Sequence, residues 1–197
     1  MRSGQHQFTH LDFLGPQKIS SAIVNGSTVT DTIYHSIADF TFNDLNGNAI
    51  SFGNQPPSYW VFHFFNTGCA QPCPDVFRNL FDVVRDFKEA PKVKFLSITT
   101  QPQNDSISVL TMFEKLNGVK APQWLLCRGD SLSVDSLMRN SFFLSGNAGN
   151  QALSQVFLVD PNRHLRGIYD GSDLMDMRRL KDEIKVLSYE TRKNRNK

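Results

Sequence analysis

Residues 59–80 read YWVFHFFNTGCAQPCPDVFRNL, and this stretch decides the predicted fold. Its first seven residues are aromatic or β-branched apart from one histidine, which is typical of a central strand buried on both faces of a sheet. From Pro74 to Glu89 apolar residues recur at helical spacing. Proline is tolerated in the first turn of a helix, where its missing N–H would have no partner. The stretch therefore predicts a strand, a loop that holds Cys69 and Cys73, and a helix.

Strand and helix patterns continue on both sides of this unit. Alternation on either side of Asn46-Gly47 predicts a β-hairpin over residues 39–52. Downstream, the patterns predict strands at 93–99, 124–127, 155–160 and 165–169. They also predict helices at 105–117, from 131 or 133 to 138, and at 173–187. A β-α-β unit followed by a closing β-hairpin and a last helix is the plan of a thioredoxin-like α/β fold, here with an N-terminal β-hairpin extension.

The chain divides into three predicted parts. Residues 1–36 are mixed and turn-rich, and we expect a partly irregular lead-in with one or two short strands. Residues 37–190 are predicted to form the thioredoxin-like domain, and residues 191–197 a solvated basic tail. A length of 197 residues, of which 40% are hydrophobic and 20% charged, fits one globular domain.

Composition and charge exclude several classes of function. The net charge is only +2, and no basic stripe interleaved with aromatic residues indicates nucleic-acid binding. No apolar run in the sequence approaches the ~20 residues that cross a bilayer. Three cysteines are too few for a disulfide scaffold, so the two that lie close together indicate redox or metal chemistry.

The position of the cysteine pair favours a reactive thiol. Cys73 directly precedes Pro74 at the predicted helix start, where free N–H groups and the helix dipole stabilise a thiolate. If the loop is coiled, the Cys69 sulfur comes within bonding distance, so the pair can form a reversible disulfide or hold a soft metal ion. The alternative is two unrelated cysteines. Cys127 ends an apolar run and is expected to be a free core cysteine.

At these residues the chain resembles the Sco/SenC family, copper-binding proteins with a thioredoxin-like fold that serve cytochrome c oxidase assembly. The resemblance runs from about Asp39 to Leu187, and its most specific part is the signature T-x-C-x-x-x-C-P, which begins here at Thr67. Further matches are Phe95 to Ile98, Pro102, Asp105, Trp124 and Phe157 to Pro161. The resemblance implies that Cys69 and Cys73 carry both the redox chemistry and any copper binding.

The resemblance also implies a histidine ligand for copper, in an Asp-His pair before the penultimate strand. Anchored on Val159-Asp160-Pro161, the matching positions are Gln151 and Ala152, neither of which binds copper. The Asp-Pro that usually follows the preceding Ser-Ile strand is also changed, to Gln101-Pro102. Copper delivery is therefore less well supported than the redox chemistry of the cysteines.

The five histidines of the chain do not replace the missing ligand in this prediction. We expect His63 to pack within its strand and His164 to occupy a solvent-exposed turn roughly 20 Å from the cysteines. His35 belongs to a lead-in segment that could fold back over the site. His6 and His10 are expected to be disordered.

The sequence therefore predicts a thiol–disulfide redox protein that acts in cytochrome c oxidase copper-site assembly or in extracytoplasmic thiol redox. The alternative is a copper(I) carrier with a two-thiolate site. A peroxiredoxin is disfavoured because Thr67 lies two residues before Cys69 and the Pro of Pro-x-x-x-Thr-x-x-Cys is missing, and intact cysteines argue against a degenerate binding module. The expected partner is a cytochrome c oxidase subunit or another thiol protein. The resemblance implies an extracytoplasmic location, with an anchor or export signal encoded upstream of Met1.

Overall fold

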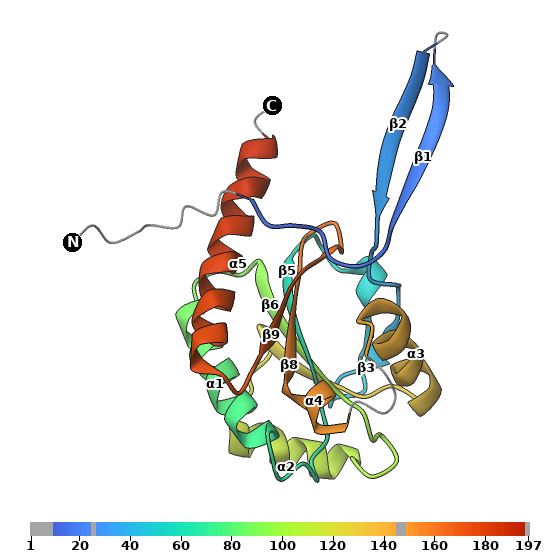
Figure 1. Cartoon of the computed structure of the whole chain (residues 1–197). Helices are drawn as coiled ribbons and strands as arrows, with labels where there is room; N and C mark the ends of the chain where they lie inside the picture. The colour runs from blue at the N-terminus through green and yellow to red at the C-terminus, as the bar shows by residue number, and fades with distance from the viewer. Residues whose placement is uncertain (1–9, 25–26, 145–148, 196–197) are drawn as a thin grey trace, which may run out of the picture.

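The computed structural model describes residues 10–24, 27–144 and 149–195 (Figure 1). Its central sheet has five strands in the order β7-β6-β5-β8-β9. These strands are β5 (Tyr59–Phe65), β6 (Val93–Thr99), β7 (Trp124–Cys127), β8 (Gln155–Val159) and β9 (Leu165–Asp170). All of β5 is buried, and it pairs in parallel with β6 and antiparallel with β8. This arrangement confirms the predicted thioredoxin-like α/β fold.

Helices cover both faces of the sheet. They are α1 (Cys73–Asp86), α2 (Ile107–Asn117), α3 (Ser131–Ser141), α4 (Gly149–Ser154) and α5 (Leu174–Arg195). Successive side chains of a strand point to opposite faces, so β5 contributes to two cores. Val61 and Phe65 pack with α1 and α5, whereas Phe62 and Phe64 pack with α3 on the other face. Figure 1 shows α1 and α5 together on one side and α3 on the other.

The predicted hairpin at residues 39–52 is present as β3 (Thr41–Asn43) and β4 (Ala49–Ser51). The Asp44 carboxylate accepts hydrogen bonds from the backbone N–H groups of Asn46, at 2.9 Å, and Asn48, at 2.8 Å. Gly47 has a φ of 81°, a conformation that favours glycine because it has no Cβ. The hairpin packs its buried Phe42 into the core on the α3 side of the sheet.

The structure differs from the predicted elements in three places. In the lead-in, β1 (Gln17–Val24) and β2 (Ser27–Tyr34) form a regular antiparallel hairpin with two strands of eight residues. The six-residue helix α4 precedes β8 and was not predicted. Two helices are longer than their patterns indicated, because α3 continues to Ser141 and α5 to Arg195, inside the segment predicted as a basic tail.

A buried arginine explains why the N-terminal segment and the end of α5 have defined positions. The guanidinium of Arg166, whose side chain is 5% exposed, lies 2.8 Å from Asp160 Oδ2 and 3.0 Å from Glu190 Oε2. It also donates to the backbone oxygen of Leu11, whose N–H donates to Glu190 at 2.6 Å. His10, expected to be disordered, has its Nδ1 3.4 Å from Glu190 Oε1.

Among the residues that the structure describes, none of the helices combines the length and the apolar composition that a membrane crossing needs.

Candidate functional site

The carboxyl ends of the parallel strands β5, β6 and β7 share one edge of the sheet, where reactive groups of open α/β folds are found. The loop after β5 lies there and contains a disulfide between Cys69 and Cys73, with Cα atoms 5.9 Å apart. Cys73 is the first residue of α1 and is 2% exposed, whereas Cys69 is half-buried. The sulfur of Cys69 is therefore the more accessible of the two.

The start of α1 suits a thiolate at Cys73. The N-cap residue is Pro72, which makes no side-chain cap, and its backbone oxygen accepts from the N–H groups of Asp75 and Val76. The positive end of the helix dipole favours a negative charge at the first residue of the helix. When the disulfide is reduced, the dipole at the helix start therefore favours Cys73 over Cys69 as the leaving thiolate.

A buried carboxylate fixes the loop that carries Cys69. Asp105 is 1% exposed, and both of its carboxylate oxygens lie 3.3 Å from the backbone nitrogen of Thr67. The hydroxyl groups of Thr67 and Thr99 also donate to this carboxylate. Asp105 therefore joins the ends of β5 and β6 and holds the chain two residues before Cys69.

The sequence predicts a helix that begins at residue 105, but α2 begins at Ile107. Its N-cap is Ser106, whose Oγ accepts from the N–H of Val109 at 3.4 Å. The signal that could have revealed the role of Asp105 is its pairing with the threonine of the T-x-C-x-x-x-C-P signature. A loop carboxylate and a threonine hydroxyl that both match one family pattern are candidates for mutual contact.

His63 packs inside the fold, as predicted. It is 1% exposed, its Nε2 lies 3.1 Å from the backbone oxygen of Leu153, and its ring meets that of Phe77 edge-on at 5.2 Å. Burial lowers the pKa of His63 to about 4, because the charged form would lose its hydration, and the hydrogen bond that His63 donates to the backbone oxygen of Leu153 opposes this only in part. A neutral, enclosed imidazole links β5 to the short helix α4.

Ala152, at the position where a histidine is expected, lies at the same edge of the sheet as the disulfide loop. Ala152 is 4% exposed in α4, which packs against β5 and α1, and the neighbouring Gln151 is exposed. Within residues 10–24, 27–144 and 149–195, no three His, Cys, Asp or Glu side chains are grouped so that they could hold a metal ion. The described residues therefore offer copper two sulfur ligands and no imidazole.

The other histidines that the structure describes lie away from the cysteines. His164 is at the opposite end of β8 as predicted, but it is half-buried rather than exposed to solvent and meets the ring of Phe13 edge-on at 5.1 Å. His35 does not fold back over the site: its Nε2 lies 2.9 Å from the backbone oxygen of Ser141, and the next residue pairs with His164. His6 lies outside the described residues.

Cys127 is a core residue, as predicted. It is fully buried at the end of β7 and is free rather than disulfide-bonded. Burial raises the pKa of its thiol far above the usual range, because a thiolate there would lose its hydration. Cys127 is therefore unsuited to act as a third reactive thiol.

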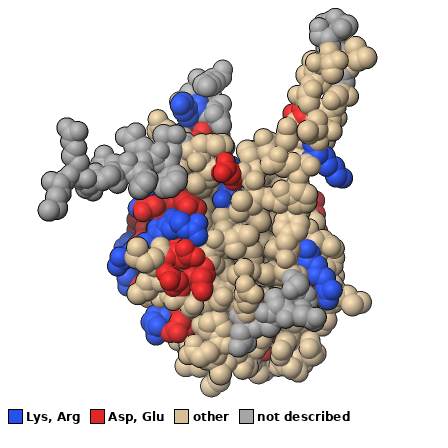
Figure 2. All heavy atoms as spheres, viewed as in Figure 1, with Lys and Arg blue, Asp and Glu red and all other residues tan. Residues whose placement is uncertain are grey.

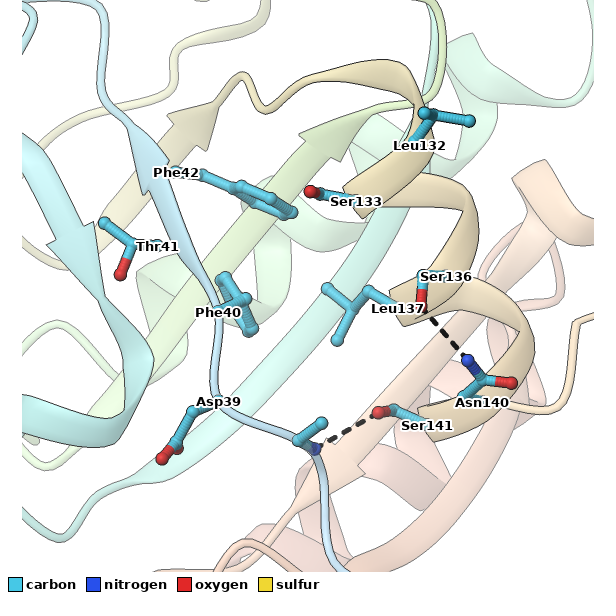
Figure 3. A pocket seen from close by; sticks show the side chains of 11 residues that line it. Asp39, Phe40, Thr41, Phe42, Leu132, Ser133, Ser136, Leu137, Asn140 and Ser141 are labelled. Atoms are coloured by element: carbon cyan, nitrogen blue, oxygen red, sulfur yellow. Dashed lines mark hydrogen bonds between the residues drawn. The ribbon is translucent and has the colours of Figure 1, made fainter.

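A cleft of about 450 Å³ lies beside α3, and its lining residues come from segments 38–42 and 132–141, outside the disulfide loop (Figure 3). One wall is made by the segment that contains Phe40 and Phe42, and the other by small and apolar side chains of α3 such as Ser136 and Leu137. Among the described residues that line it, Asp39 is the one ionisable side chain, and none is a cysteine or a histidine.

Comparisons with known proteins agree with this site. A family model described as SCO1/SenC matches residues 30–187, well over half of the chain. A curated relative, the SCO1 protein homolog of Bacillus subtilis (strain 168), is 24% identical over 153 residues, which cover 74% of this chain and 79% of the relative.

Solved structures show the same fold. A SCO1/SenC family lipoprotein from Bacillus anthracis str. Ames has a TM-score of 0.70 and 19% identity, covering 78% of this chain and 95% of its own. BsSco, described as a member of the Sco family of cytochrome c oxidase assembly proteins with a disulfide switch, gives 0.68 and 22%, with coverages of 78% and 94%. Yeast Sco1 with copper bound gives 0.59 and 18%, with coverages of 77% and 92%.

The family match takes in the disulfide loop, the buried carboxylate that holds it and almost all of the central sheet with its covering helices. This chain therefore belongs to the SCO1/SenC family.

Proposed function

We propose that this protein is a thiol–disulfide redox protein that acts through Cys69 and Cys73 in cytochrome c oxidase copper-site assembly or in extracytoplasmic thiol redox. The observation that carries the proposal is a disulfide at the start of α1 between one half-buried and one buried cysteine. A reversible couple needs an accessible sulfur that a thiolate can attack and a leaving thiolate that its surroundings stabilise. Cys69 meets the first requirement and Cys73 the second.

The exchange proceeds in two balanced steps. A partner thiolate attacks Sγ of Cys69, the Sγ–Sγ bond breaks, and Cys73 leaves as a thiolate, which gives a mixed disulfide between the partner and Cys69. A second partner thiolate then attacks the partner's own sulfur in that mixed disulfide and releases Cys69. The partner loses two electrons and gains a disulfide, and Cys69 and Cys73 end as thiols.

Single cysteine variants test this order. When reduced Cys73→Ser is treated with glutathione disulfide, Cys69 should form a persistent mixed disulfide with one glutathione and release the other, because Cys73 is absent and the remaining thiol, Cys127, is buried. Reduced Cys69→Ser should react at least about tenfold more slowly, because its remaining sulfur is buried at the helix start. Mass spectrometry follows both reactions, with Cys127→Ala as the control that should behave like the wild type. A mixed disulfide that accumulates only on Cys73 would reverse the assignment.

A copper(I) carrier is the second candidate, supported by the two adjacent sulfurs and by relatives solved with copper bound, among them yeast Sco1. Two thiolates suit Cu(I), which is soft and accepts low coordination, whereas Cu(II) favours a site with imidazole. Titration of the reduced protein against a Cu(I) chelator should show one equivalent bound, with binding lost in Cys69→Ser and in Cys73→Ser. Tighter binding of Cu(II) than of Cu(I) would contradict a site made only of thiolates.

We also propose a cytochrome c oxidase subunit or another thiol protein as the partner and an extracytoplasmic, membrane-anchored location for the full-length protein. Support comes from BsSco, which belongs to the cytochrome c oxidase assembly proteins, and from the Bacillus anthracis relative, which is a lipoprotein. A membrane-impermeant maleimide applied to intact, reduced cells should label Cys69 if this location is right. Labelling only after the cells are broken would place the protein on the other side of the membrane.

A further inference from the structure

The exposed face of α2 is unusually apolar and lies next to the disulfide loop. Val109, Met112 and Leu116 follow one another at spacings of three and four residues, so they form one stripe, and they are 41%, 67% and 78% exposed. Only Leu110 of this helix is fully buried. Scattered exposed apolar residues are normal on a protein surface, but a contiguous group indicates an interaction site.

The stripe runs into a cleft that begins at the residue after Cys73. This cleft has a volume of about 390 Å³ between α1 and the end of α2, and its lining includes Pro74, Phe81 and Leu116. Phe81 is itself 41% exposed. Figure 1 places α2 across the lower end of the molecule, and Figure 2 shows that end mostly free of charged side chains, in contrast to the face over α5.

The ionisable side chains that line this cleft are both cationic. Arg78 and Lys115 line it, and none of its described lining residues is a carboxylate. Asp75 lies against Arg78 and offsets part of its charge, which leaves Lys115 as the cation to vary. Apolar walls with a basic rim complement a segment that carries apolar side chains flanked by Asp or Glu.

We propose that the surface formed by Phe81, Met112, Lys115 and Leu116, here called the α2 surface, docks the thiol-bearing segment of the redox partner. The proposal rests on the function proposed above and adds the chemistry of the partner, a protein segment with apolar and acidic residues beside its cysteine. The cleft is continuous with the reactive loop through Pro74, so a segment seated there is tethered beside the disulfide. Such tethering raises the effective concentration of its thiol at Cys69.

The test uses two synthetic peptides of equal length, each with a single cysteine. One carries leucine, phenylalanine and aspartate around the cysteine, and the other carries serine, glycine and lysine. The measured quantity is the rate of mixed-disulfide formation with the oxidised protein, divided by the rate of reduction by dithiothreitol. Comparing one peptide across protein variants cancels the effect of its flanking residues on its own thiol pKa.

The double variant Met112→Ser/Leu116→Ser should lower this ratio about tenfold for the acidic apolar peptide, as expected when one leucine side chain loses its burial. Lys115→Glu should lower it severalfold for that peptide and raise it for the lysine peptide. The matched controls are Leu132→Ser, which removes an equally exposed helical leucine from α3, and Lys92→Glu at the opposite edge of the sheet. Both controls should give the wild-type ratio.

Equal ratios for the α2-surface variants and the controls would overturn the proposal. So would sedimentation that shows a wild-type dimer lost in the double variant, or binding to anionic phospholipid vesicles lost in it, because the surface would then belong to a second copy or to a membrane. A disulfide that neither dithiothreitol nor either peptide reduces would instead refute the redox function and the docking proposal with it. Normal reduction by dithiothreitol with equal peptide ratios would refute the docking surface alone.

Discussion

Three donors converge on one buried carboxylate beside the disulfide. The N–H and hydroxyl of Thr67 and the hydroxyl of Thr99 all donate to Asp105. The carboxylate is 1% exposed, and these three hydrogen bonds replace those that water would make. Buried charges persist where hydrogen bonds replace the lost water. The geometry of the Cys69 loop therefore depends on a residue that takes no part in the redox chemistry itself.

Asp105→Asn should weaken the hydrogen bonding that connects the ends of β5 and β6 through Thr67 and Thr99. An amide offers one acceptor oxygen and turns an N–H group toward donors, so at least one buried donor is left without a partner. We expect the free energy of unfolding of the oxidised protein to fall by about 1–3 kcal/mol in urea titrations. Asp135→Asn, which breaks an exposed ion pair with Arg139 on α3, should change it by less than about 0.5 kcal/mol. Equal effects of the two variants would show that Asp105 is not a structural joint.

His63 makes stability depend on pH in a defined direction. The unfolded chain takes up a proton on this histidine below about pH 6.5, whereas the folded protein resists protonation until about pH 4. The stability that a neutral His63 allows is therefore fully present above pH 6.5 and is lost as the pH falls toward 4, by roughly 3 kcal/mol in total. His63→Gln keeps a donor for Leu153 and cannot be protonated, so its unfolding free energy should fall less over that range. A ring NMR signal of His63 that titrates near pH 6.5 would contradict this.

Among single residues, the sequence predicted the pairing of Cys69 with Cys73 and missed the carboxylate that holds their loop. The loop position and the helix start identified Cys69 and Cys73, because those features are local. Asp105 was missed as a joint because its partner Thr67 is 38 residues away, and a carboxylate just before a helix has the same local pattern whether it caps that helix or joins two strands.

At the scale of elements, long periodic segments were predicted and short or unpacked ones were not. β5 and α1 carry strong patterns because each buries its apolar residues against a core. The hairpin of β1 and β2 has no such face: Ile19, Ile23, Val29 and Ile33 are all at least half exposed. Its order comes from pairing between the two strands, which a one-strand pattern does not reveal. Figure 1 shows this hairpin projecting from the body of the molecule.

The short helix α4 contains Ala152, the position at which the family resemblance expects a histidine ligand for copper. If Ala152 occupies the place of the family's histidine ligand, Ala152→His should strengthen Cu(II) binding markedly, because Cu(II) prefers imidazole to a site of thiolates alone. Gln151→His is the matched control, since that residue is adjacent but exposed. Competition titrations measure both variants, and circular dichroism shows that each is folded. Equal affinities in the two variants would show that Ala152 is not the ligand position.

In the whole molecule, the residues that stabilise the fold lie apart from the disulfide loop. Two apolar cores hold the sheet from both faces, and the Arg166 cluster fastens the N-terminal segment to α5 at the edge away from the cysteines. The reactive loop and the start of α2 are left at the opposite edge, where the parallel strands end. The predicted order of strands and helices was sufficient to place the loop at that edge, because parallel strands joined by helices end on the same side.

We propose that Cys69 and Cys73 form one reversible two-electron couple from which Cys127 is excluded. A titration in dithiothreitol redox buffers tests this proposal: samples are quenched, denatured and alkylated, and their masses are measured by mass spectrometry. Two species only are expected: the oxidised protein with one alkylated cysteine, identified as Cys127, and the reduced protein with three. A disulfide that includes Cys127, or a pair that stays reduced across the whole range of buffers, would contradict it.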